Sequence, residues 1–126
     1  MANKVGLKKV VEKMNLKNLT PDVDLTEKKV EVPDINRPAL QLTGFFEHFD
    51  SERVQIIGYV EYTFLEKMDE KTKEETYETL LSYQIPCIIF CRNLPPEPML
   101  LEKATRANIP VFITEKQTSE FTAEII

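Results

Sequence analysis

The sequence predicts an α/β fold with a small, mostly parallel sheet of about four strands flanked by helices. Two continuous apolar runs, 85–91 (IPCIIFC) and 109–113 (IPVFI), are typical of strands that are buried on both faces. The residues between these runs have helical spacing, and strand, helix and strand in that order predict a parallel pair joined by a right-handed crossover. A β-branched run at 53–58 (RVQIIG) predicts a further buried strand.

The composition is that of one globular domain without a surface for nucleic acid or membrane. At 126 residues the chain fits a single domain with its own core. The net charge is -5 and the 16 basic residues are scattered among acidic ones, so nucleic acid is not an expected partner. No run reaches the roughly 18 apolar residues that span a bilayer, and lysines interrupt the N-terminus where a signal peptide would be apolar. We therefore expect no membrane partner and a cytoplasmic location.

The sequence predicts no catalytic, cofactor-binding or metal-binding residue within this chain. Its glycines are Gly6, Gly44 and Gly58. They lie too far apart for the glycine-rich loops whose backbone amides cradle phosphates. His48 is the single histidine, so a two-histidine metal site is excluded, and we expect it to be a partly exposed residue without a ligand. Cys87 and Cys91 lie in one predicted strand, roughly 13 Å apart, which is too far for a disulfide.

The first third of the chain predicts one helix and one short strand. Apolar residues at i, i+3, i+4 and i+7 predict a helix at 7–14, which Asn3 can cap and Asn15 can end. Polar and turn-forming residues at 16–28 predict a connection. Alternation at 30–32 then predicts a short strand, which Pro33 ends because proline cannot donate to a strand ladder.

The stretch that follows, 34–49, predicts a helix that begins near Pro38. Its apolar residues at helical spacing are Leu42, Phe45, Phe46 and Phe49. Leu40 and Leu42 also alternate, so a strand is the alternative for this part. Gly44 costs about 1 kcal/mol inside a helix relative to alanine, so it indicates close packing or the helix end.

The second half of the chain predicts four helices. The segment 59–65 (YVEYTFL) fits both periods, and we favour a helix from about Glu61. A second helix at 69–83 opens with the charge block DEKTKEE, which we expect to be its solvated face. The third follows the prolines at 95–98 and ends at Asn108, with Glu102 and Arg106 paired on its outer side.

The last predicted helix contains Phe121 and Ile125, with Thr118 or Ser119 as its cap. Because this pattern stops without a terminal glycine or basic residue, we expect the sequence to be a piece of a longer protein.

Three segments, in this order and spacing, make the chain similar to a known family. They are 34–38 (DINRP), 52–58 (ERVQIIG) and the strand, proline-rich turn and helix at 85–107. Together they resemble the N-terminal domain of bacterial HPr kinase/phosphorylase, and the resemblance covers nearly all of the chain. It implies one domain over 1–126, followed by a C-terminal catalytic domain, and a fold resembling the N-terminal domains of peptidoglycan precursor ligases.

The resemblance also implies a function. Members of the family use ATP or pyrophosphate with Mg to phosphorylate a serine of HPr, the phosphocarrier of the sugar phosphotransferase system, and they also remove that phosphate. They act in carbon catabolite repression and form homo-oligomers, hexamers in the family. Their P-loop, catalytic carboxylate and histidine lie in the C-terminal domain, and those motifs are not in this sequence. The resemblance therefore implies a non-catalytic accessory or regulatory domain, with the C-terminal domain and HPr as partners of the whole enzyme.

Two turns depart from the family pattern. Ala39 stands where many members have glycine, and Cys91-Arg92-Asn93 replaces a threonine, arginine and glycine turn. The departures put a ligand-contacting role of these turns in doubt.

A second hypothesis is a small-anion or metabolite-sensing module. Parallel sheets favour ligand crevices at switch points beyond the carboxyl ends of their strands. Arg37 and Arg92 each follow a strand and would contact the anion through their forked donors. The alternative is that both arginines brace turns.

A third hypothesis is a free-standing enzyme that uses Tyr59, Glu61, Glu47 and His48. Their spacing pairs no nucleophile with a base, so we regard this hypothesis as the weakest.

Overall fold

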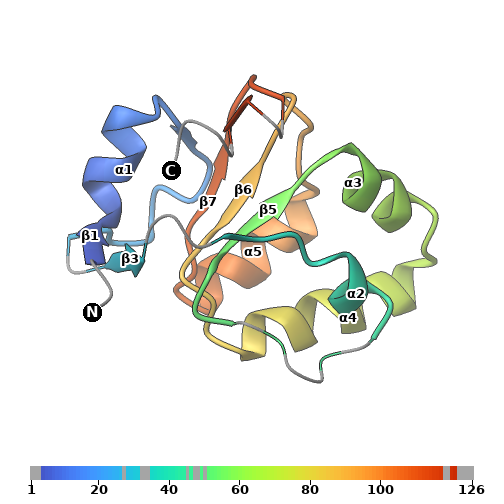
Figure 1. Cartoon of the computed structure of the whole chain (residues 1–126). Helices are drawn as coiled ribbons and strands as arrows, with labels where there is room; N and C mark the ends of the chain where they lie inside the picture. The colour runs from blue at the N-terminus through green and yellow to red at the C-terminus, as the bar shows by residue number, and fades with distance from the viewer. Residues whose placement is uncertain are drawn as a thin grey trace.

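A computed structural model describes residues 4–26, 28–31, 35–44, 46, 49, 51–117 and 120–121 (Figure 1). Its elements are β1 (Lys4–Gly6), α1 (Leu7–Lys13), β2 (Lys17–Asn18), β3 (Lys29–Glu31), β4 (Ile35–Asn36), α2 (Ala39–Leu42), β5 (Val54–Ile57), α3 (Tyr59–Glu66), α4 (Glu70–Ser82), β6 (Ile88–Phe90), α5 (Pro98–Arg106) and β7 (Val111–Ile113). Among the described helices, none is long and apolar enough to cross a membrane.

The centre of the fold is a five-stranded sheet in the order β2-β7-β6-β5-β4. Strands β4 to β7 are parallel, and β2 pairs antiparallel with β7 at the edge. In the register, Ile57 pairs with Phe90, and Phe90 pairs with Ile113. The mostly parallel sheet predicted from the sequence is thereby confirmed, with one strand more than the expected number.

The strands that sequence patterns missed are all two or three residues long. β1 pairs antiparallel with β3 in a separate two-stranded sheet, where Val5 pairs with Val30. β2 lies within the segment that was predicted to be a connection, and β4 lies within the one that was predicted to lead into a helix. Segments this short contain too few residues for a period of two to be recognised.

The central strands are buried on both faces and separate two apolar cores. On one face, Val54, Ile56, Ile89 and Phe112 pack against residues of α1. On the other face, Ile57, Ile88, Phe90 and Val111 pack against residues of α3, α4 and α5. Figure 1 shows α1 on one side of the sheet and α2 to α5 on the other. Alternate residues of each strand therefore serve different cores, which is why these strands are continuously apolar.

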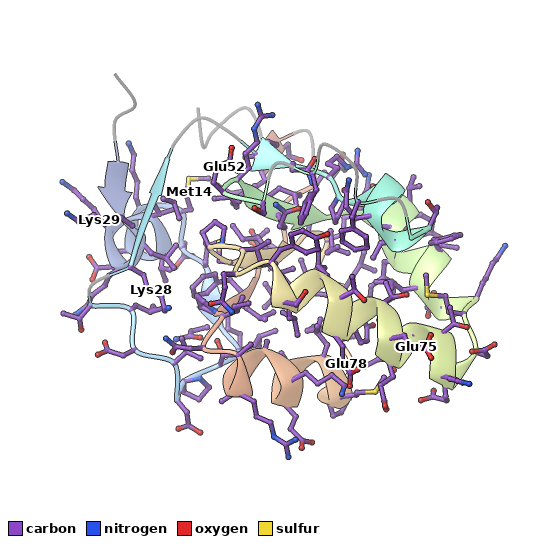
Figure 2. All side chains as sticks on the ribbon, turned by 90° about the horizontal axis from the view of Figure 1, so that it is seen from below. Met14, Lys28, Lys29, Glu52, Glu75 and Glu78 are labelled. Carbon is purple, nitrogen blue, oxygen red and sulfur yellow. The ribbon has the colours of Figure 1, made fainter. Side chains whose placement is uncertain are left out.

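Side-chain contacts fasten the outer elements to one another (Figure 2). Glu78 of α4 accepts a 2.7 Å hydrogen bond from Lys103 of α5, and in this view Glu78 lies between the two helices. Lys28, beside β3, donates to the backbone carbonyl of Asn108 at 2.9 Å. The second contact connects the small two-stranded sheet to the end of α5.

The helix predicted to run from near Pro38 to Phe49 is wrong in its extent. Among the described residues of this stretch, only Ala39–Leu42 are helical, and Gly44 follows with a φ of 100°, a left-handed conformation that glycine adopts without strain. Phe46 and Phe49 instead pack around Tyr83, with ring centroids 5.0 and 5.1 Å from it. The spacing of the aromatic residues therefore indicated an apolar cluster and not a continuous helix, because the helix ends before Gly44. Phe45 lies outside the described residues.

The other helices agree with the sequence. Asn15 and Asn108 have φ values of 54° and 60° and follow α1 and α5, as predicted. α3 begins two residues before the predicted start, Pro98 begins α5, and Glu102 pairs with Arg106 at 2.6 Å. Of the last predicted helix, only Glu120 and Phe121 are described.

Phe121 is completely buried in the core on the α1 side. Other residues with predicted roles in caps, helices or the strand at 30–32 lie outside the described part of the chain: Asn3, Val32, Pro33, Thr118, Ser119 and Ile125.

Substitution of Gln84, the residue after the C-cap of α4, tests whether the end of this helix is strained. Gln84 is exposed and has a φ of 55°, a conformation that costs a non-glycine residue roughly 1 kcal/mol. We expect Gln84→Gly to raise the free energy of unfolding by up to about 1 kcal/mol, measured by urea denaturation. Glu74→Gly, at an exposed position inside the same helix, is the control and should lower it by about 1 kcal/mol. Equal losses in both variants would contradict the strained helix end.

Candidate functional site

The polar residues gather at one edge of the sheet, where the parallel strands end. Arg37 follows β4, Gly58 follows β5, Arg92 follows β6 and Thr114 follows β7. Because parallel strands all end at the same edge, these four positions share one side of the fold. It is the edge at which α/β proteins commonly bind ligands.

Glu61 is the buried charge at this edge. Its side chain is 2% exposed, and its Oε1 atom accepts a 2.7 Å hydrogen bond from the backbone N–H of Gly58. The same oxygen accepts a 2.9 Å hydrogen bond from the guanidinium of Arg37, whose side chain is 43% exposed. The carboxylate thereby occupies the positive N-terminus of α3, the place where an external anion would otherwise bind.

A buried amide network lies beside this pair and joins β4 to β5. Asn36 donates to the side-chain carbonyl of Gln55 at 2.7 Å, and Gln55 donates to the backbone carbonyl of Arg53 at 2.8 Å. Gln55 is completely buried, so these bonds replace its lost hydration. The strand that precedes Arg37 is therefore held by side chains as well as by its short ladder.

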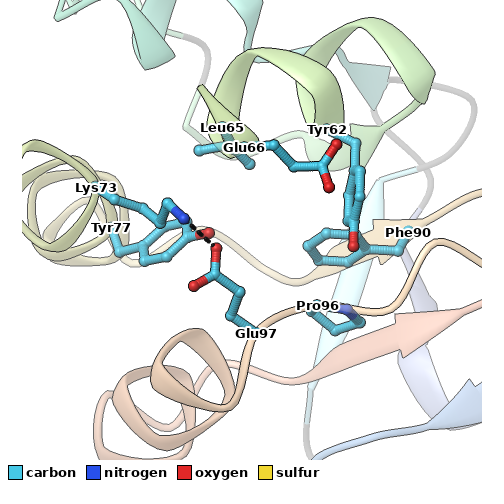
Figure 3. A pocket seen from close by; sticks show the side chains of 8 residues that line it. All are labelled: Tyr62, Leu65, Glu66, Lys73, Tyr77, Phe90, Pro96 and Glu97. Atoms are coloured by element: carbon cyan, nitrogen blue, oxygen red, sulfur yellow. Dashed lines mark ion pairs between the residues drawn. The ribbon is translucent and has the colours of Figure 1, made fainter. Parts of the chain in front are cut away.

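A cavity of about 260 Å³ lies between α3, α4 and the start of α5 (Figure 3). Its lining residues are Tyr62, Leu65, Glu66, Lys73, Tyr77, Phe90, Pro96 and Glu97. The ammonium of Lys73 and the carboxylate of Glu97 form an ion pair at 2.6 Å, which is drawn as a dashed line. The Tyr62 hydroxyl donates to the backbone carbonyl of Pro95 at 2.7 Å. These contacts fasten α3 and α4 to the turn that begins α5.

The charges of this cavity are matched within the protein. The hydrogen bond that Lys73 donates to Glu97 raises the pKa of Lys73, and burial, with the nearby Glu97 charge, raises the pKa of Tyr77. At neutral pH the ammonium is therefore charged and the phenol is neutral. Neither group exchanges a proton near pH 7, as a general acid or base at this pH must. We interpret the arrangement as a structural link between helices.

The position of Lys73 differs from the one predicted from the sequence. The charge block at the start of α4 was expected to be solvated, but the Lys73 side chain is only 9% exposed. A helical signal was present: Lys73 lies four residues before Tyr77 and seven before Leu80, both on the buried face. A long aliphatic stem lets a lysine occupy such a position while its charge reaches a partner.

The two candidate arginines have different contacts. Arg37 pairs with Glu61 of α3, as expected of an arginine that braces a turn. The backbone N–H of Arg92 donates to the carbonyl of Lys116 at 2.9 Å, on the β7 side of the sheet. The anion-binding role assigned to these arginines stays a prediction.

The switch-point argument for a ligand crevice is wrong for this sheet. A switch point arises where the order of parallel strands reverses. From β4 to β7 the strands are adjacent in chain order, without a reversal. A ligand site at this edge would therefore have to be argued from the side chains that line it and not from the strand order.

The residues considered for a free-standing enzyme are not assembled as one. Tyr59 is 61% exposed, and Glu61 is buried in its ion pair with Arg37. Glu47 and His48 lie outside the described residues. Cys87 and Cys91 are both buried and form no disulfide, and burial raises the pKa of the Cys87 thiol to about 12. A thiol of this kind is unreactive at neutral pH. Within the described part of the chain, no three His, Cys, Asp or Glu side chains are grouped as metal ligands.

Fold and edge together define a class: an α/β domain whose mostly parallel sheet is covered on both faces, and whose carboxyl edge is braced by ion pairs of its own. A comparison with family models gives a match over residues 5–126. The chain belongs to the family described as HPr Serine kinase N terminus.

Relatives from several bacteria support this membership. The HPr kinase/phosphorylase of Lachnoclostridium phytofermentans is 49% identical over 122 residues, which are 97% of this chain and 40% of that protein. The HPr kinase/phosphorylase of Caldicellulosiruptor bescii is 38% identical over 113 residues, 90% of this chain and 36% of that protein. The chain thus spans less than half the length of these relatives.

A solved structure supports the fold. It contains the CBS and DRTGG domains of the regulatory region of Clostridium perfringens pyrophosphatase, complexed with the activator diadenosine tetraphosphate. The TM-score is 0.59 at 13% sequence identity, over 95% of this chain and 45% of that chain. At this identity the likeness concerns the fold alone.

The Arg37–Glu61 pair can be tested by a double-mutant cycle. Arg37→Ala leaves a buried carboxylate without its cation, so we expect the free energy of unfolding to fall by roughly 1–3 kcal/mol, the half-exposed arginine keeping it below the cost at a fully buried pair. Glu61→Gln keeps an acceptor for the Gly58 amide and should cost less. In the double variant, we expect a coupling energy of about 1 kcal/mol by urea denaturation.

The exposed Glu102–Arg106 pair provides the control. Its side chains are 64% and 77% exposed, so the same cycle should give a coupling below about 0.5 kcal/mol. Equal coupling energies at the two pairs would show that burial of Glu61 does not strengthen its ion pair.

Proposed function

We propose that this chain is the N-terminal accessory domain of an HPr kinase/phosphorylase, and that it regulates or positions the catalytic part without performing the chemistry. The observation that carries this proposal is the family match over 5–126, in a chain that corresponds to 40% or less of the two relatives compared above. The remaining part of such a protein is long enough to form a separate catalytic domain.

The chemistry of the described residues supports an accessory role. The buried cation and phenol of the cavity are held in fixed protonation states, and the N-terminus of α3 is occupied by Glu61. Transfer of a phosphoryl group needs donors and a metal arranged around the phosphate. We assign the binding of ATP or pyrophosphate, with Mg, to the C-terminal domain of the parent enzyme.

The proposed partners follow from the same assignment. They are the C-terminal catalytic domain of the same protein, HPr as a partner of the whole enzyme, and further copies in a homo-oligomer, a hexamer by analogy with the family. The proposed location is the cytoplasm and the proposed process is carbon catabolite repression. The first relatives are named for both a kinase and a phosphorylase activity, which supports a bifunctional parent enzyme.

Deletion of this chain from a full-length parent enzyme tests the proposal. We expect the remaining part to phosphorylate HPr and to remove the phosphate, with an altered oligomeric state or an altered response to effectors. Phosphorylated HPr is measured by mass spectrometry and the oligomeric state by light scattering. The matched control adds the isolated chain back to the deleted enzyme.

Loss of both activities from a remaining part that is still folded and assembled would contradict an accessory role. An enzyme unchanged in activity, effector response and oligomeric state would contradict a regulatory or positioning role.

A further inference from the structure

Helix α3 exposes apolar side chains where the neighbouring helices expose charged ones. Of the four large apolar side chains that are exposed in the described part of the chain, three lie on α3: Tyr59 at 61%, Val60 at 65% and Phe64 at 41%. The exposed sides of α1 and α4 are charged instead, as at Lys13 and Glu74. Single exposed apolar residues are normal on a protein surface, whereas a group of them on one element marks an interaction site.

These side chains form one continuous surface on the side of the helix that faces away from the core. We call it the outer face of α3, and its residues are Tyr59, Val60, Thr63, Phe64 and Lys67. Residues three or four apart on a helix are neighbours, so Val60 adjoins both Thr63 and Phe64. The buried residues of the helix, Glu61 and Leu65, lie on its opposite side. Figure 1 shows α3 at the far side of the fold from α1.

Lys67 is the one charged residue of the outer face. No ion pair joins its ammonium to another residue that the structure describes. The two acidic side chains of α3 lie elsewhere, because Glu61 is buried against Arg37 and Glu66 lines the cavity of Figure 3. A complementary partner is therefore apolar and carries a carboxylate near Lys67.

The size of the outer face decides what kind of partner it suits. An aromatic side chain offers about 150–250 Å², so the exposed parts of Tyr59 and Phe64 amount to roughly 200 Å², to which Val60 adds less. Interfaces that hold two free proteins together bury about 800 Å² on each partner. Two copies of this chain that meet only at this face therefore bury too little for a stable dimer. A partner in the same polypeptide needs less area, because the covalent link raises its effective concentration.

The relatives indicate that such a partner belongs to the same polypeptide. The chain corresponds to 40% and 36% of the two HPr kinase/phosphorylases compared above, so more than half of each of those proteins lies outside the matched part. We propose that the outer face of α3 docks against the catalytic part of the parent enzyme, with Tyr59, Val60 and Phe64 in the contact. The identity of this partner rests on the proposed function. Deletion of the chain reports on the accessory role, whereas the solvent exposure of Tyr59 reports on this face alone.

Hydroxyl-radical oxidation, measured by mass spectrometry, compares the exposure of these side chains in the isolated chain and in the full-length parent enzyme. We expect Tyr59 to be oxidised about fivefold more slowly in the parent enzyme, because residues inside an interface are shielded from water. Tyr83 is the internal control, since it is also exposed, at 41%, but lies at the C-cap of α4. Equal oxidation of Tyr59 in the two proteins, or equal slowing of Tyr59 and Tyr83, would overturn the proposal.

A charge within the contact should open it. In the parent enzyme, Val60→Asp should restore rapid oxidation of Tyr59, because a carboxylate is costly to bury in an apolar contact. An acidic residue in the first turn of a helix favours the helix, so the fold should be retained. Thr79→Asp adds the same charge at an exposed position of α4 and should leave Tyr59 protected. The proposal fails if both variants expose Tyr59 or if neither does, and urea denaturation of the isolated chain verifies that each variant folds.

A photo-crosslink identifies the partner. The photoreactive amino acid p-benzoylphenylalanine, in place of Lys67 in the parent enzyme, attaches on illumination to the segment that lies on the outer face of α3. We expect the crosslinked peptide to come from the catalytic part. A peptide from a second copy of this chain or from added HPr would contradict the proposal, and so would the absence of a crosslink.

Discussion

The ion pair between Glu61 and Arg37 is the constraint on which this edge of the fold depends. A carboxylate that is 2% exposed must recover the hydration that it has lost, and it does so through the Gly58 amide and the arginine. The amide fixes the turn from β5 into α3. The arginine fixes the end of β4, a strand of only two residues. One side chain thereby holds an edge strand and a helix in place relative to each other.

The same logic applies elsewhere along the carboxyl edge. Where Arg37 and Lys73 lie, carboxylates of the protein neutralise the cations. These pairs connect the end of β4 to α3, and α4 to the start of α5. Stability explains this part of the edge.

Sequence patterns predicted the elements that are long or continuously apolar and missed those that depend on distant partners. β5, β6 and β7 are buried on both faces, so their apolar runs were unambiguous. β1, β2 and β4 are too short for a period to be seen. Glu61 at the third position after Gly58 fits a capping box. Its partner Arg37 lies 24 residues earlier in the chain, and no local sequence pattern predicts a contact over that separation.

We propose that this chain folds around its own ion pairs and that phosphoryl transfer belongs to another part of the parent enzyme. To test this, the purified chain is incubated with HPr, Mg and either ATP or pyrophosphate, and HPr is then examined by mass spectrometry. We predict that HPr remains unmodified while the parent enzyme, assayed in parallel, phosphorylates it. Transfer of phosphate to an HPr serine by the chain alone would show that this domain is itself catalytic and would contradict an accessory role.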